Sequence, residues 1–118
     1  MKYVCLVYGE ESAIHALTQE ELAKVDADSL AHDRSLAKSG KLVIAQALQS
    51  VETSKTVRRR GGKTLVTDGP FAETKEQLLG FLMIEADSFD EAVGMAGEVP
   101  LAAMGSIEVR AIYTIPGS

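Results

Sequence analysis

Hydrophobic positions divide the first third of the chain into a strand and a helix. Residues 3–8 form a continuous apolar run rich in β-forming side chains, which predicts a first strand that is central in its sheet. Thr18 and Glu21 have the spacing of a capping box, in which each side chain hydrogen-bonds the other residue's backbone N–H. A helix is therefore predicted over 18–39, with Gly40 as its left-handed stop.

A hairpin is predicted around Gly61, near the middle of the chain. The β-forming segments on either side are separated by two glycines, and a two-residue loop of this type favours a tight turn between antiparallel strands. The resulting register sets Val57 opposite Val66 and Lys55 opposite Asp68. Both are favourable cross-strand pairs.

The other segments complete an α+β pattern. A second capping box begins at Ser88 and predicts a short helix that ends at Gly97. Further strands are predicted over 41–48, 77–86 and 106–115. This order is that of a split βαβ unit with an inserted hairpin, so we expect a ferredoxin-like antiparallel sheet with both helices on one face, in a single domain over 1–118.

Two of the strands are apolar on both faces. An antiparallel sheet with one solvated face alternates polar and apolar residues, but residues 3–8 and 78–84 are apolar at both parities. Two helices can cover only one face. We therefore expect a second copy to cover the other, in a two-fold homodimer whose sheets pack face to face.

Composition and charge narrow the function classes. The 118 residues carry a formal net charge of −5, which disfavours nucleic acid as a partner. A single cysteine, Cys5, fits a reducing compartment, and neither a membrane span nor a signal peptide is predicted. A soluble cytoplasmic protein is expected. No cofactor or metal site is predicted, because the histidines are well separated and phosphate-binding glycine loops are missing.

The most distinctive segment is residues 66–77, which contains Asp-Gly-Pro turn chemistry. In one interpretation it is a turn whose Phe71 enters the core and whose charges lie in water. In the other, the loop presents Asp68, Glu73 and Lys75 at the mouth of a pocket.

Residues 67–77, followed by Leu78 and Gly80-Phe81, resemble the signature of the DGPF branch of the YCII-related family. The resemblance extends over almost the whole chain and implies a dimeric α/β-barrel arrangement. Some members of the family are proposed to be enzymes, and some are linked to sigma-factor systems. In the wider family a histidine of the first helix is paired with an aspartate before a proline. This chain keeps His32 but has Val99 before Pro100, so Asp68 would have to take over as the partner.

His32 lies on the apolar face of the first predicted helix, and Arg58 begins a run of three arginines. A histidine so placed is either a core residue or, beside a carboxylate, a general base. Alternation along the strand sends Arg58 and Arg60 to one face and Arg59 to the other. Arg58 is nearest the 66–77 segment and is the candidate for holding an anionic group.

Two functions fit these observations. The first is a small-molecule binding domain, with or without enzymatic activity, that takes a ligand, anionic groups included, in a pocket near the DGPF segment. Its candidate catalytic residues are His32 and Asp68, and its candidate ligand-binding residues are Arg58, Phe71, Glu73 and Lys75. The second is a non-catalytic interaction module associated with sigma factors or transcription regulation.

Overall fold

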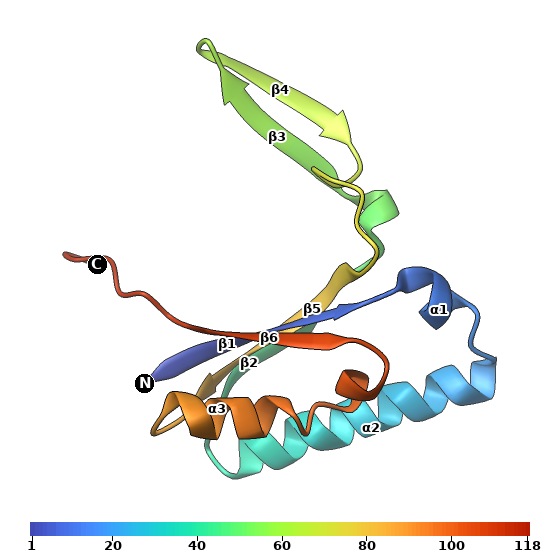
Figure 1. The fold of residues 1–118 in the computed structure, drawn as a ribbon, viewed down its shortest axis with the longest axis vertical. Coiled ribbons are helices and arrows are strands. Elements are labelled where there is room, and N and C mark those ends of the chain that lie inside the picture. Colours follow the sequence, from blue (N-terminus) through green and yellow to red (C-terminus); the bar gives the residue numbers. More distant parts are fainter.

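A four-stranded antiparallel sheet with the order β2-β5-β1-β6 forms the body of the protein (Figure 1). The computed structural model describes residues 1–118. The strands are β1 (Lys2–Gly9), β2 (Leu42–Ala47), β5 (Gln77–Glu85) and β6 (Ser106–Ala111). All three neighbouring pairs are antiparallel. This confirms the ferredoxin-like α+β fold and the central place of the first strand.

Three α-helices and two short 3-10 turns connect the strands. They are α1 (Glu11–His15), α2 (Gln19–Lys38), η1 (Val51–Thr53), α3 (Phe89–Ala96) and η2 (Pro100–Ala103). The predicted capping box of α2 is present: Thr18 Oγ1 accepts from the Glu21 N–H at 3.1 Å, and the Glu21 carboxylate accepts from the Thr18 N–H at 3.0 Å. Hydrogen bonds from Thr18 lower the pKa of Glu21. The sequence pattern does not predict α1, because five residues are too few to show helical periodicity.

The core lies between the sheet and the helices α2 and α3, which occupy the same side of the sheet (Figure 1). On this face of β1, Tyr3, Cys5 and Val7 are buried, and Ile84 of β5 is only 1% exposed. Burial raises the pKa of the Cys5 thiol, which makes the reactive thiolate harder to form. Cys5 is therefore a core residue, as its strand position predicts.

On β1 and β5 the opposite face of the sheet is also apolar, and no helix covers it. Val4 lies beside Met83 and Leu6 beside Phe81 across the β1–β5 ladder. All four side chains are half-buried. The two-faced apolar pattern predicted for these strands is thus present, and the helices shield only one face.

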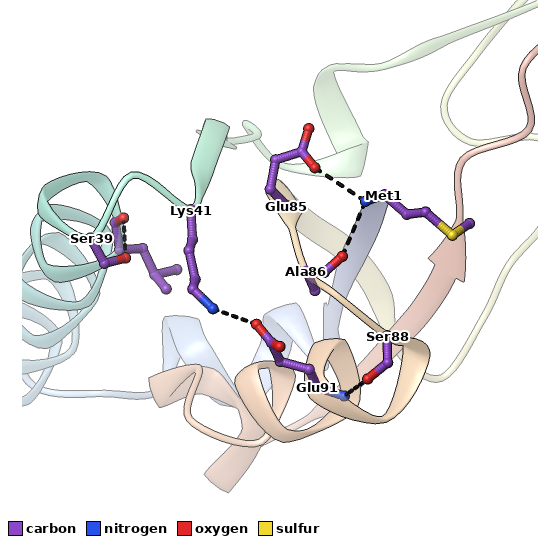
Figure 2. Close-up of polar contacts among 8 residues, drawn as sticks. Met1, Ser39, Lys41, Glu85, Ala86, Ser88 and Glu91 are labelled. Carbon is purple, nitrogen blue, oxygen red and sulfur yellow. Dashed lines mark hydrogen bonds and ion pairs between the residues drawn. The ribbon is translucent and has the colours of Figure 1, made fainter.

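Polar contacts join the start of β2 and the amino terminus to the β5–α3 connection (Figure 2). The ammonium of Lys41 hydrogen-bonds the carboxylate of Glu91, which raises the pKa of Lys41 and lowers the pKa of Glu91. The Met1 ammonium donates to the Ala86 carbonyl at 3.1 Å. Only half of the capping box predicted for α3 forms: Ser88 Oγ accepts from the Glu91 N–H, but the Glu91 carboxylate turns to Lys41 instead.

The last strand is shorter than predicted. β6 ends at Ala111, opposite Tyr3, and the Ile112 N–H makes one more bond to the Lys2 carbonyl. Beyond that point β1 offers no further backbone partner. The prediction of a strand over 112–115 was therefore wrong, since β propensity alone does not make a ladder without a neighbouring strand.

The predicted hairpin forms a sheet of its own. Its strands β3 (Lys55–Arg60) and β4 (Lys63–Asp68) pair in the predicted register, with Val57 opposite Val66 and Lys55 opposite Asp68. Gly61 and Gly62 both have positive φ, 56° and 75°, as a tight hairpin turn requires. Residues 55–68, called the arm below, project away from the four-stranded sheet and the helices (Figure 1).

Candidate functional site

A cleft of about 670 Å³ lies at the root of the arm. We call it the DGPF cleft, and we call residues 68–77 the DGPF loop. The walls of the cleft come from the DGPF loop, from residues 48–56, and from the adjoining ends of β1 and β5. Apolar side chains make up part of the lining: Tyr8, Leu48, Val51, Pro70, Phe71 and Leu78. The other lining residues include the hydroxyl-bearing Ser50, Thr53, Ser54, Thr56 and Thr74.

The backbone conformation of Gly69 turns the chain from β4 into the DGPF loop. Gly69 has φ +88°, a conformation that side chains with a Cβ rarely adopt, and it turns the chain away from β4. Its N–H donates to the Ser54 carbonyl at 2.8 Å, and its carbonyl accepts from Thr56 Oγ1 at 2.9 Å. The loop is therefore fastened to the opposite wall of the cleft at its second residue, Gly69.

Two side chains that sequence reasoning missed hold the other end of the cleft. The Glu11 carboxylate accepts from Ser50 Oγ at 2.9 Å and from the Val51 N–H at 3.1 Å. Gln77 Oε1 accepts from the Glu11 N–H at 2.8 Å, while its Nε2 donates to the Thr74 carbonyl at 2.7 Å. The only sequence signal for Glu11 is a carboxylate just after the first strand, which by itself indicates no partner.

Among the predicted ligand-binding residues, Phe71 and Glu73 line the DGPF cleft. Phe71 is 76% exposed, so the interpretation in which it enters the core is wrong. The loop leaves the body at the root of the arm and carries the ring outward. Lys75 is turned to the outer side of the loop, where its Nζ lies 3.9 Å from Glu10 Oε1. Arg58 is half-buried on the same face of β3 as Thr56, two residues farther from the cleft.

The two candidate catalytic residues lie in different places. Asp68 is at the end of β4, and its carboxylate accepts from Lys55 Nζ at 2.6 Å. His32 is on α2 and lines a separate cavity of about 100 Å³ between α2, the sheet and Pro100. Asp68 lines neither this cavity nor the DGPF cleft. The expected His32–Asp68 pairing is not formed within a chain, because the arm that carries Asp68 projects away from α2.

The surroundings of His32 are mostly apolar. Its side chain is 13% exposed, and its Nδ1 lies 3.8 Å from Asp33 Oδ1, beyond hydrogen-bond distance. The buried Nε2 has no hydrogen-bond partner in the chain. Val99, 8% exposed, lines the same cavity at the position where the wider family was expected to place an aspartate.

Comparison with known proteins identifies the family. The YCII-related domain profile matches residues 1–116. The chain belongs to the YCII-related family. The predicted resemblance to the YCII-related family is thereby confirmed.

This YCII-related protein is similar to one relative in sequence and to one solved structure in fold. Uncharacterized protein R00369 of Rhizobium meliloti (strain 1021) is 43% identical over 112 residues, which are 93% of this chain and 90% of that protein. The structure of 5-chloro-2-hydroxyhydroquinone dehydrochlorinase from Burkholderia phenoliruptrix AC1100, in complex with 2,5-dihydroxybenzoquinone, matches with a TM-score of 0.58. The match covers 96% of this chain and 94% of that one at 15% identity, so it shows the shared fold.

Neither a metal-binding cluster nor a membrane-spanning helix is found in this YCII-related chain. No group of three or more His, Cys, Asp or Glu side chains is arranged to hold a metal ion. None of the helices combines the length and apolar character that crossing a membrane would require.

Proposed function

We propose that this protein is a homodimer that binds a small organic molecule in the DGPF cleft. The size and lining of the cleft carry the proposal. Small-molecule sites are concave, range from about 300 to 1,000 Å³, and combine apolar walls with a few polar groups. The DGPF cleft has a volume of about 670 Å³ and combines the rings of Tyr8 and Phe71 with the hydroxyls of Ser54, Thr56 and Thr74.

The lining favours a planar ligand that carries hydrogen-bonding groups. The exposed ring of Phe71 offers a face for stacking. The three hydroxyls already donate their protons to backbone carbonyls, so their oxygens can accept hydrogen bonds from the ligand. An anionic substituent would meet Arg58 beyond Thr56, on the same face of β3. The fold neighbour in complex with 2,5-dihydroxybenzoquinone supports a ligand of this size class.

Ligand binding is tested by calorimetry with 2,5-dihydroxybenzoquinone and benzoate as probes. Phe71→Ala removes the stacking face and is expected to weaken binding of a responding probe about tenfold. Tyr113→Ala is the matched control, because Tyr113 is as exposed as Phe71, 77% against 76%, and does not line the cleft. Equal effects of the two variants would contradict a ligand site at the DGPF cleft.

The homodimer rests on the uncovered sheet face. Phe81 and Met83 of β5, with Val4 and Leu6 of β1, form an apolar surface that a second sheet can bury. The two-fold axis would place the same residues of both copies in contact.

Sedimentation at micromolar protein tests the homodimer. Wild-type protein is expected to sediment as a dimer, and Phe81→Asp as a monomer, because two carboxylates would be buried across the axis. Ala31→Asp on the exposed side of α2 is the control and is expected to remain dimeric. Wild-type protein that sediments as single chains would refute this part of the proposal.

Catalysis at His32 is a second candidate, and the unpartnered Nε2 favours it. A buried imidazole nitrogen without a hydrogen-bond partner is a group that a substrate or a water could engage. The neighbouring cavity of about 100 Å³ admits only a small substrate group. A ligand-dependent reaction that His32→Asn abolishes, while Asp33→Asn leaves it intact, would support this role.

A further inference from the structure

The charges of the protein are divided between the arm and the rest of the chain. Within residues 55–68 the cations are Lys55, Arg58, Arg59, Arg60 and Lys63, and the only carboxylate is Asp68. The arm therefore carries a net charge of +4. Since the whole chain carries −5, the remaining residues carry −9.

No helix or further strand of its own chain packs on the arm. Val57, Leu65 and Val66 are 63%, 48% and 57% exposed, although an apolar pair across a hairpin is usually covered. An isolated two-stranded hairpin is at best marginally stable in water. All of β4 is exposed, and β3 is half-buried only at Thr56 and Arg58, so a further contact would stabilise the hairpin in its extended form.

The root of the arm is acidic. Glu73 and Glu76 line the DGPF cleft, and Glu52 lies beside it on the neighbouring surface. The cation of the cleft wall, Lys55, is already paired with Asp68. The tip of the arm cannot fold back to neutralise this root, because six residues of ladder hold it about 20 Å away.

A two-fold dimer brings the two complementary surfaces together. In such a dimer every contact occurs twice, so a basic tip and an acidic root on one chain can meet the root and tip of a second copy. We propose that, in the homodimer, the arm of each copy lies against the root of the other and closes its DGPF cleft, with the basic tip of the arm against the carboxylates of Glu73 and Glu76. This inference rests on the proposed homodimer and deepens it, because the ligand site is then incomplete in one chain.

Cross-linking between two single-cysteine variants tests the exchange of arms. One tagged chain carries Thr64→Cys near the tip of the arm, and an untagged chain carries Ala72→Cys at the root; both positions are exposed. Cys5 is buried and is not expected to form a disulfide in this experiment. After mixing and mild oxidation we expect a disulfide between tagged and untagged chains. Ala23→Cys on the exposed side of α2 is the matched control and should not cross-link to the arm.

The outcomes separate this inference from the homodimer itself. A sedimenting dimer without the arm-to-root disulfide, or with equal cross-linking to α2, would overturn the exchange of arms and leave the homodimer standing. Monomeric wild-type protein would refute both.

Charge reversal gives an independent readout. Arg59→Glu with Arg60→Glu is expected to weaken the dimer about tenfold or more, since like charges would then face each other. Adding Glu73→Arg and Glu76→Arg to the same chain should restore it. Lys24→Glu is the control for a change of surface charge, as Lys24 is 75% exposed on α2. Binding of duplex DNA by the wild-type arm, lost in the arginine variants while the dimer is unchanged, would overturn the proposal in favour of a nucleic-acid partner.

Discussion

Replacement of His32 by leucine is expected to stabilise the protein. The imidazole is 13% exposed, and its Nε2 is buried without a hydrogen-bond partner in the chain. In the unfolded state the same nitrogen is hydrated. Folding therefore removes a polar atom from water without compensation. Leucine has no polar atom, fills a similar volume, and suits the apolar face of α2.

The expected gain is about 1–2 kcal/mol in the free energy of unfolding. Leaving a buried polar group unsatisfied costs roughly 1–3 kcal/mol, and the variant recovers this term. Leucine also has a higher helix propensity than histidine, by a few tenths of a kcal/mol. The value is placed in the lower half of the range because the ring keeps some exposure, 13%. For a domain of this size the midpoint of thermal unfolding should rise by about 4–8 °C.

Urea unfolding followed by circular dichroism measures this change, and His15→Leu is the matched control. His15 is exposed on α1, so its replacement gains propensity without removing a buried polar atom and should change the free energy by less than about 0.5 kcal/mol. A loss of more than 1 kcal/mol in His32→Leu would refute the reasoning, since it would mean that Nε2 is satisfied or that the ring packs better than leucine. The stable variant would also show whether His32 is needed for any activity.

Other substitutions test the packing and electrostatics of the fold. Gly105→Ala should destabilise the protein by about 3 kcal/mol or prevent folding, because the added Cβ would lie 2.0 Å from a backbone carbonyl of β1. By contrast, the Cβ added by Gly94→Ala in the exposed middle of α3 meets nothing within 4 Å, and this variant should be more stable by about 0.5–1 kcal/mol. Equal effects of the two substitutions in urea unfolding would contradict the close approach of Gly105 to the backbone of β1. Thr18→Ala removes an N-cap and should cost about 1 kcal/mol, whereas a neutral result would mean that the capping box adds nothing to stability. The hydrogen bond between Lys41 and Glu91 lowers the pKa of Glu91 and raises the pKa of Lys41. Its contribution to stability is therefore present between about pH 5 and pH 10. This contribution is lost as pH falls through the folded pKa of Glu91, and also as pH rises through the folded pKa of Lys41. The difference in unfolding free energy between wild type and Lys41→Met should therefore shrink toward pH 3, and a pH-independent difference would refute this origin.

Part of the candidate site was predictable because its signals are local. The turn at Gly69 and the loop that follows are encoded by adjacent residues, and the structure places Phe71 and Glu73 of this loop at a cleft. Glu11 was not predictable. Its partners in the wall of the cleft are about forty residues away, and no spacing in the sequence indicates them.

The expected pairing of His32 with Asp68 also shows that the sequence does not predict contacts between distant residues. The sequence identifies residue types suited to acid–base chemistry, but whether two of them meet depends on where a strand and a helix lie in the folded chain. Here Asp68 lies at the end of β4 in the projecting arm, whereas His32 lies on α2 and faces the sheet.

The sequence alone determined the type and order of the strands, the cap of α2, the hairpin register and the apolar character of both sheet faces, since each depends on periodicity or on contacts within a few residues. Tertiary structure decided that the arm stands free of the body, that β6 ends at Ala111 where β1 runs out, and that Glu91 turns to Lys41 rather than to its own helix cap. These features result from competition among partners distant in sequence, and only the folded arrangement decides which contact is made.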